Sequence, residues 1–396
     1  MLMYYFGVAE TVHMELGKIY NLAEDFVRHC EVQTQMASVK PKITWKTLIM
    51  LLIGIVAFII YLFILPVDIL EIFAKIQRVN MPLYLLAASL IFVEMFFYSV
   101  AWHSLLSFLS VKLSILKSYL YVWYGNFMDI IIPAESISGE ISRAYLITRE
   151  QGNAVSGKVA ASLVAHRLIG MSVGAATIGT GTMMLLMTPV NPLIFNLSVF
   201  VTGATIFFII LLAILCIKIS WTLKIIDCLI KIFEFIGKSR WKSKLAKTRE
   251  ISFKIVEVFH DSMKEYARAP KVVLKSILLS AFSWLSYLAI CYIIFLAIGF
   301  EKPPLNMISI IFVTQSITTA VKSIPIGVPF EVGLPEITMT TLYVVLGVPF
   351  DISATATILT RILSLWLKFF VGFAIQQWVE ISAIKESLKT VKADKG

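Results

Sequence analysis

Basic side chains that could bind phosphate lie inside strongly apolar stretches of this sequence. Arg167 comes ten residues after an apolar stretch begins at Gly157, and Arg361 comes nine residues after Ile352. With a rise of about 1.5 Å per residue, each arginine would lie roughly 14 Å along a helix that begins there. A guanidinium group matches phosphate with its planar donor fork. The pair therefore predicts a polar cavity, although snorkelling or an ion pair is the alternative for either arginine.

Two short motifs place charges one helical turn apart after a glycine. They are Gly139-Glu140-x-x-Arg143 and Gly333-x-x-Glu336. Free backbone amides at a helix start can hold an anion, but Glu336 could equally cap a short helix. Lys322 is either a phosphate contact or an interfacial anchor. The three acids among the candidates are also the candidate ion-pair partners of the arginines. The candidate substrate-binding residues are Arg143, Arg167, Lys322, Arg361, Glu140, Glu331 and Glu336.

Prolines and glycines interrupt the apolar pattern near both motifs. A proline removes a backbone donor and clashes with the preceding helical turn, and irregular backbone in lipid survives only beside protein or a water-filled cavity. We also expect Asn126 and Asp129 to interrupt the helix that begins at Ile115. The predicted backbone breaks are Pro133, Gly139, Pro325, Gly327, Pro329 and Gly333.

The composition is that of an all-α polytopic membrane protein. Hydrophobic residues make up 58% of the chain and charged residues 15%, against about 25% charged in soluble domains; the mean hydropathy is +0.85. The formal charge of +10 comes from basic residues that flank apolar segments, so they indicate topology and lipid contacts and do not indicate nucleic-acid binding. The cysteine and histidine spacings give no metal site, no nucleotide or hydrolase motif is present, and neither a cofactor nor an enzyme is expected.

Six apolar stretches are long enough to cross a membrane, which takes about 20 residues. The second of them holds Glu94, an acid at membrane depth and hence a candidate proton site. The alternative is that Glu94 is protonated or bonded to a neighbouring helix. The predicted spans are residues 47–65, 81–109, 157–187, 193–217, 272–298 and 352–384.

Charge decides the topology. Residues 218–275 hold fourteen basic and six acidic side chains, and the positive-inside rule assigns such a loop to the cytoplasm. That assignment requires residues 115–152 to enter the membrane and return, and residues 305–349 to do so from the other side. Two discontinuous hairpins of opposite orientation predict an inverted repeat with the substrate near the midplane.

The domain boundaries follow from this topology. Residues 1–40 form an N-terminal extension that is either poorly packed or an interfacial helix. Residues 41–384 form the transmembrane domain, with a basic cytoplasmic connector at 218–271, and residues 385–396 form a basic cytoplasmic tail. The protein is expected in the cell membrane, with both termini on the cytoplasmic side. A shift of 194 residues aligns Gly139 with Gly333 and Arg167 with Arg361, but the order of elements carries the repeat, since such identities are no better than chance.

The ordered motifs resemble a known family. They run from Gly125-Asn126-Phe127 to Ile132-Pro133, through Gly139-Glu140-x-x-Arg143, then from Ser323-Ile324-Pro325 to Gly333-x-x-Glu336, with Leu346-Gly347-Val348 and residues 354–361 after them. Together they resemble the lysylphosphatidylglycerol synthase transmembrane, or flippase-like, family over roughly residues 47–384. Extra prolines and Glu331 depart from the family's Pro-Gly-Gly-x-Gly-x-x-Glu pattern, which leaves the substrate open.

The resemblance implies the membrane part alone, because about a dozen residues follow the last span where bifunctional members carry a soluble aminoacyl-transferase domain. That membrane part is associated with moving modified phospholipids or polyprenyl-linked glycans between leaflets. We therefore expect a transporter of an anionic or phosphate-bearing lipid, with membrane lipids as partners and the oligomeric state open. The alternative is a membrane-embedded transferase or an accessory subunit of a lipid or glycan synthesis complex, in which Asp129, Glu135 and Glu140 could begin a metal cluster.

Overall fold

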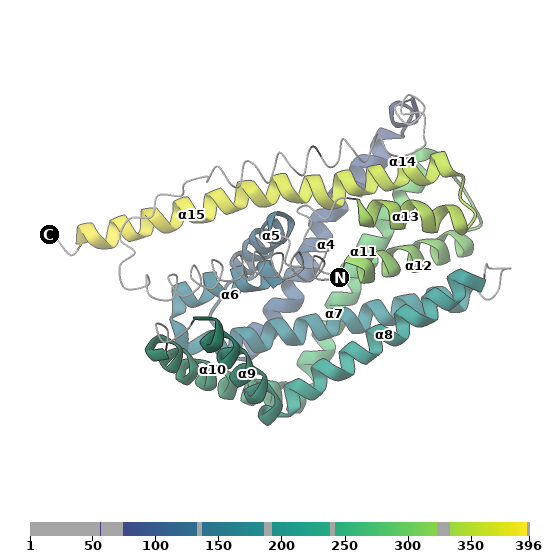
Figure 1. The fold of residues 1–396 in the computed structure, drawn as a ribbon. Coiled ribbons are helices and arrows are strands. Elements are labelled where there is room, and N and C mark those ends of the chain that lie inside the picture. Colours follow the sequence, from purple (N-terminus) through teal and green to yellow (C-terminus); the bar gives the residue numbers. More distant parts are fainter. Residues whose placement is uncertain are drawn as a thin grey trace, which may run out of the picture. The chain divides into compact units, whose positions relative to one another are not determined.

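The computed structural model describes residue 56 and residues 74–132, 137–185, 192–237, 242–322 and 333–393. Every regular element in these ranges is a helix (Figure 1), which confirms the all-α fold class. Several predictions lie outside the described residues: the N-terminal extension, the first span apart from residue 56, the last three residues of the tail, and the site residues Pro133, Pro325, Gly327, Pro329 and Glu331.

Helices follow one another with short connections. In chain order they are α4 (Met81–Phe108), α5 (Ile115–Ile131), α6 (Ile137–Gln151), η1 (Asn153–Val155), α7 (Ser156–Leu185), α8 (Pro192–Ile217), α9 (Ile219–Gly237), α10 (Lys242–Arg268), α11 (Pro270–Ile298), α12 (Pro304–Lys322), α13 (Leu334–Val345), α14 (Phe350–Arg361), the π-helical segment η4 (Ile362–Leu367) and α15 (Lys368–Ala393).

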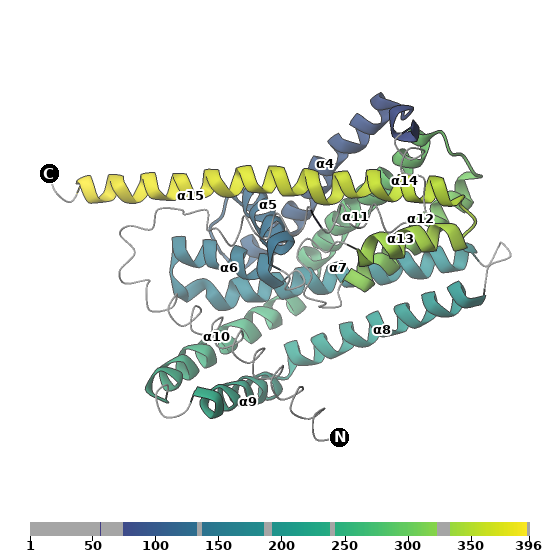
Figure 2. The same cartoon turned by 45° about the horizontal axis from the view of Figure 1, so that its top comes forward.

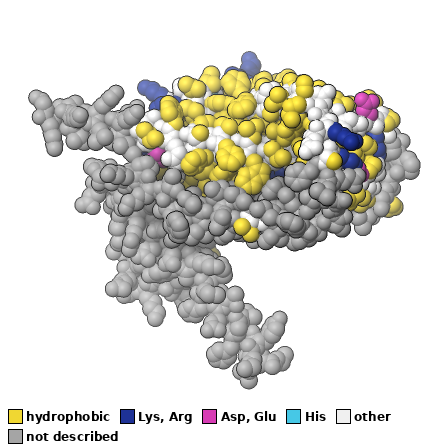
Figure 3. All heavy atoms as spheres, turned by 90° about the horizontal axis from the view of Figure 1, so that it is seen from above, with side chains coloured by type: hydrophobic (Ala, Val, Ile, Leu, Met, Phe, Trp, Pro, Cys, Tyr) yellow, Lys and Arg dark blue, Asp and Glu magenta, His cyan; other side chains and the backbone are white. Residues whose placement is uncertain are grey.

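Six helical segments of the described chain are long and apolar enough to cross a membrane: Met81–Phe108, Asn153–Met184, Phe195–Ile217, Pro270–Ile298, Pro304–Lys322 and Phe350–Ser382. Five of them coincide with predicted spans. The sixth, Pro304–Lys322, belongs to the region predicted as the second hairpin. In Figure 3, hydrophobic side chains make up most of the coloured part of the surface, as expected for a surface in lipid.

The chain divides into two compact units. One comprises Trp45–Gln376 and holds α4 to η4 together with the first part of α15. The other comprises Met1–Thr44 and Gln377–Gly396, of which the structure describes the remainder of α15. The helices that form the candidate site all belong to the larger unit.

Helices α4 and α11 lie along each other at the centre of the larger unit (Figures 1 and 2). Small residues allow the close approach: the Ser276 hydroxyl donates to the carbonyl of Ala101 at 3.2 Å, and the Ser283 hydroxyl donates to the carbonyl of Glu94 at 3.0 Å. Serine hydroxyls that bond across helices are a common means of holding apolar helices together in lipid. The pair fixes the backbone on which Glu94 is carried.

Helices α5 and α6 form a hairpin that differs from the sequence prediction. Asn126 and Asp129 do not interrupt the chain, because α5 continues through both to Ile131. Gly139, predicted at a break, lies in the first turn of α6. A Cβ atom at Gly139 would collide with the carbonyl oxygen of Gly125, so the glycine serves close helix packing.

Helix α13 begins directly after Gly333, whose φ of +105° suits glycine. A turn separates α13, which ends at Val345, from α14, which begins at Phe350, and Gly347 in this turn has a φ of +84°. The Lys302 ammonium donates to the Gly347 carbonyl at 2.6 Å. The chain thus reverses sharply just before the helix that carries Arg361.

The connector consists of two helices, α9 and α10. Helix α10 packs against α7, where a Cβ at Gly157 would lie 2.6 Å from the carbonyl oxygen of Ile255. The Tyr266 hydroxyl of α10 also donates to the carbonyl of Leu105 in α4, at 3.0 Å. These contacts tie the basic connector to the ends of two spans.

Candidate functional site

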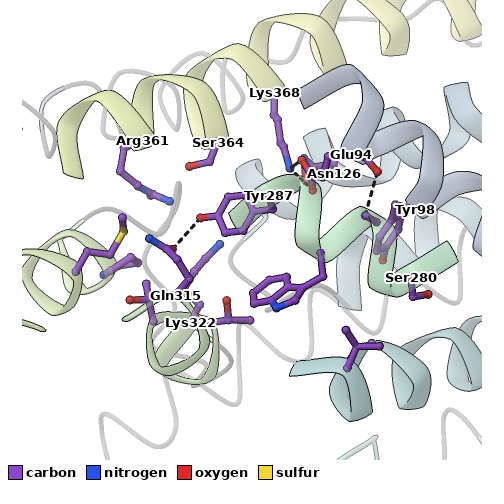
Figure 4. Close-up of a pocket in the computed structure, with 18 of the residues that line it drawn as sticks. Glu94, Tyr98, Asn126, Ser280, Tyr287, Gln315, Lys322, Arg361, Ser364 and Lys368 are labelled. Carbon is purple, nitrogen blue, oxygen red and sulfur yellow. Dashed lines mark hydrogen bonds and ion pairs between the residues drawn. The ribbon is translucent and has the colours of Figure 1, made fainter. Parts of the chain in front are cut away.

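A cavity of about 320 Å³ lies among α4, α5, α7, α11, α12, α13 and the segment from α14 to α15. Its volume is at the lower end of the roughly 300–1,000 Å³ typical of small-molecule sites. Figure 4 shows charged and polar side chains from separate helices converging on it. Four charged residues line it: Glu94, Lys322, Arg361 and Lys368.

Arg361 forms a buried ion pair at one end of the cavity. Its Nε donates to Oε1 of Glu336, and the two residues are 3% and 0% exposed. The other carboxylate oxygen of Glu336 accepts from the backbone N–H of Gly333 at 2.7 Å. Glu336 therefore both caps α13 and neutralises Arg361, which combines two interpretations that the sequence had left as alternatives.

Glu94 and Lys368 form a second buried ion pair. The Lys368 ammonium lies 2.8 Å from Oε2 and 3.0 Å from Oε1 of Glu94. Glu94 is thus bonded to a neighbouring helix, one of the two alternatives that the sequence allowed. Lys368 was not among the predicted site residues, although its position in an apolar span was a signal of the same kind as that of Arg361.

The two cavity cations come from one continuous helical segment. Arg361, Ser364 and Lys368 all line the cavity, and between the two cations the helix widens into the π-helical segment Ile362–Leu367. Short π-helical segments are rare and frequent at functional sites. Here the segment carries a cation at each end and a hydroxyl between them.

Uncharged polar groups complete the lining. Tyr287 donates through its hydroxyl to Oε1 of Gln315 at 3.0 Å, and Nε2 of Gln315 donates to the hydroxyl of Tyr343 at 2.7 Å. Among the described residues, Nδ2 of Asn126, Oγ of Ser280 and Nε1 of Trp284 are buried and have no hydrogen-bond partner. All three residues line the cavity, and sequence reasoning identified none of them as site residues.

Arg143 and Arg167 lie outside this lining. Arg167 donates to Oε1 of Glu140 at 3.1 Å, and its side chain is 32% exposed. Arg361 lines the cavity whereas Arg167 does not, so the expectation that both arginines share one cavity is not met there. Ion pairing, the alternative for both arginines, is what the structure contains.

Arg143 is buried behind one wall of the cavity. It is 5% exposed, and its guanidinium carbon lies 4.9 Å from the ring centroid of Trp102 and 5.9 Å from that of Tyr98. Tyr98 lines the cavity together with His166, and their rings are 4.5 Å apart. A cation over aromatic faces is stabilised by their quadrupoles, so Arg143 supports this wall from outside.

Asp129 holds the start of α6. Its Oδ1 accepts from the backbone N–H of Gly139 at 2.6 Å and from the Ser138 hydroxyl at 2.8 Å. This is the use of a helix-capping carboxylate. The part of the chain that the structure describes contains no group of three or more His, Cys, Asp or Glu residues that could hold a metal ion.

Comparison with known proteins adds the following. The sequence profile of the family described as "Lysylphosphatidylglycerol synthase TM region" matches residues 48–372. The chain is 22% identical over 330 residues to a protein of Pyrococcus horikoshii described as "UPF0104 membrane protein PH1989", which covers 83% of this chain and 95% of that protein. No solved structure matches the chain.

Proposed function

Because this chain belongs to the lysylphosphatidylglycerol synthase TM family, we propose that it is a flippase-like transporter that moves an anionic, phosphate-bearing lipid between membrane leaflets. One observation carries the proposal. A polar cavity with three lining cations, Lys322, Arg361 and Lys368, lies within a bundle of apolar helices. Charged groups at membrane depth are costly and are characteristic of substrate pathways.

The proposed mechanism is an exchange of partners. A phosphate group enters the cavity and takes up the guanidinium of Arg361 in place of the Glu336 carboxylate, while Lys322 adds a second positive charge. The lipid chains remain in the surrounding hydrocarbon. Glu336 neutralises Arg361 when the site is empty, which avoids an isolated buried charge. Arg143 and Arg167 are outside the contact set that we propose.

The proposal is tested with the purified protein in liposomes, where fluorescent phosphatidylglycerol, phosphatidic acid and prenyl phosphate report leaflet exchange. Arg361→Gln should slow exchange about 10- to 100-fold, because hydrogen bonds to charged groups contribute about 1.5–3 kcal/mol. Arg361→Gln leaves the Glu336 carboxylate buried without its cation. The double variant Arg361→Gln, Glu336→Gln removes that carboxylate as well and should exchange lipid equally slowly. The matched control is Arg167→Gln, which lies outside the cavity lining and should exchange within about 3-fold of the unmodified protein.

Two results would overturn the proposal. One is the absence of leaflet exchange for every lipid, as expected if the protein were a membrane-embedded transferase or an accessory subunit. The other is unchanged exchange in both Arg361 variants. Size-exclusion profiles and thermal unfolding in detergent establish that each variant is folded before its exchange rate is interpreted.

A further inference from the structure

The cavity has a second polar region beyond the one around Arg361. Asn126, Ser280 and the Glu94–Lys368 ion pair all line the cavity, and Figure 4 draws them away from Arg361. Trp284 lies one helical turn after Ser280 on α11 and lines the same cavity. Residues four apart share one face of a helix. Four helices, α4, α5, α11 and α15, therefore contribute to this second region.

The ion pair in this region is already neutralised. The Lys368 ammonium lies within 3.0 Å of both carboxylate oxygens of Glu94. An additional anion here would have to compete with that carboxylate, as it must with Glu336 at the other end. The charge of this region therefore does not favour the binding of a second phosphate.

Apart from Oε2 of Glu94, which lies 2.8 Å from the Lys368 ammonium, the buried side-chain atoms of the described cavity lining that lack a hydrogen-bond partner are donors. Nδ2 of Asn126 and Nε1 of Trp284 can only donate, and both are buried without an acceptor in the part of the chain that the structure describes. The Ser280 hydroxyl is likewise buried without a partner, in a residue that is 7% exposed. An unpaired buried donor costs about 1–3 kcal/mol. Three such donors at one cavity point to a bound group that supplies acceptor oxygens.

We propose that Asn126, Ser280 and Trp284 form a subsite for the uncharged, hydroxyl-bearing part of the lipid head group. This inference rests on the proposed function and deepens it, because it divides the cavity into a phosphate end at Arg361 and a hydroxyl-binding end at these three residues. A bare phosphate held at Arg361 would leave the three donors unpaired. An ammonium tip would bring only further donors. A glycerol or sugar hydroxyl supplies the acceptors that the three donors lack.

The subsite determines specificity. A site built to hydrogen-bond a polar group rejects analogues that lack it, because its own buried groups then remain unpaired. The expected order of preference is therefore hydroxyl-bearing head groups first, and bare phosphates and ammonium-tipped head groups after them. Phosphatidylglycerol and a prenyl-phosphate hexose share the required chemistry, and whichever is preferred identifies the source of the hydroxyl groups.

The test compares lipids with and without a hydroxyl-bearing group on the phosphate. Equilibrium binding is measured in nanodiscs, and leaflet exchange is measured in liposomes. Phosphatidylglycerol is compared with phosphatidic acid, and a prenyl-phosphate hexose is compared with prenyl phosphate. Phosphatidylethanolamine supplies a head group with an ammonium tip. The hydroxyl-bearing member of at least one pair should bind about 10-fold more tightly. Ser280→Ala and Trp284→Phe should each reduce that preference about 5-fold and leave the bare phosphate lipid unchanged. Ser286→Ala, on the same helix but outside the lining, is the matched control.

Each outcome bears on the subsite. A preference for hydroxyl-bearing lipids that survives in both variants overturns the subsite. An equal loss of binding for hydroxyl-bearing and bare phosphate lipids also overturns it, because these side chains would then serve helix packing. Failure of the proposed function is separable, because it would appear as no leaflet exchange for any lipid. In that case binding in nanodiscs still decides the subsite: a preference lost in the variants supports it, and the absence of any preference overturns it.

Discussion

Each buried ion pair beside the cavity joins a cation of the α14–α15 segment to an acid on another helix. Lys368 pairs with Glu94 of α4, and Arg361 pairs with Glu336 of α13. The attraction within a buried pair roughly offsets the cost of removing both charges from water, whereas the loss of one partner leaves an uncompensated charge. These pairs therefore specify which helices face one another more than they add stability.

Substitutions of Lys368 and Glu94 should therefore have non-additive effects on stability. Lys368→Met alone should lower the free energy of unfolding by about 3–5 kcal/mol, because Glu94 is left buried and charged. The double variant Lys368→Met, Glu94→Gln should recover most of that loss. Thermal and denaturant unfolding in detergent measure both effects. If adding Glu94→Gln to Lys368→Met instead lowers the free energy of unfolding further, the two residues are not coupled and the assignment is wrong.

Prediction from sequence succeeded for some of these residues and not for others. The charges at Arg361, Glu336 and Glu94 stand out in apolar surroundings, so their importance and their alternative partners could be inferred. The pairing of Glu94 with Lys368 could not, because the two are 274 positions apart and the folded bundle alone brings them together. Asn126 stood out only as an expected helix interruption and as part of a family motif. Ser280 and Trp284 carry no signal of their own, since isolated polar residues are common in membrane helices.

At the scale of the element, the α5–α6 hairpin shows how packing overrides local preference. Asn126 and Asp129 resemble helix breakers in sequence. In the structure Asp129 uses its carboxylate to cap α6, and the helix before it continues. The position of Gly139 follows from the same contact, because Gly125 and Gly139 allow the two backbones to approach closely.

Gly139→Ala should therefore destabilise the hairpin, by about 1–3 kcal/mol as for other overpacked positions. Intrinsic helix propensity alone would favour alanine by up to about 1 kcal/mol, so the sign of the effect distinguishes packing from propensity. Gly179→Ala in α7 is the matched control, since a Cβ there meets nothing within 4 Å. Unfolding temperatures of both variants in detergent provide the measurement. Equal stability of the two variants would contradict the close approach of α5 and α6.

At the scale of the larger unit, two ion pairs follow a similar pattern along the chain. Glu140, next to Gly139, pairs with Arg167, and Glu336, three residues after Gly333, pairs with Arg361. In each pair an acid near the start of one helix meets an arginine of the next helix. The inverted repeat and its re-entrant hairpins nevertheless stay a prediction, because α12 is itself long and apolar enough to cross the membrane.

Orientation in the membrane is the prediction that tests this organisation directly. Helix α11 has 29 residues and is therefore about 43 Å long, enough to separate the connector from the loop after Gly299. Glu257 of α10 and Glu301 of that loop are both exposed. Since basic loops stay in the cytoplasm, Glu257 should lie inside and Glu301 outside.

Single cysteines at these two positions, in a variant that lacks Cys30, Cys216, Cys228 and Cys291, make the prediction measurable. A membrane-impermeant maleimide should label Glu301→Cys in intact cells and Glu257→Cys only after permeabilisation. The reverse pattern would place the connector outside, which would require residues 115–152 to cross the membrane once and would remove the reason for the first re-entrant hairpin. Labelling of both positions from one side would mean that α11 does not span, so the two hairpins could not open to opposite faces.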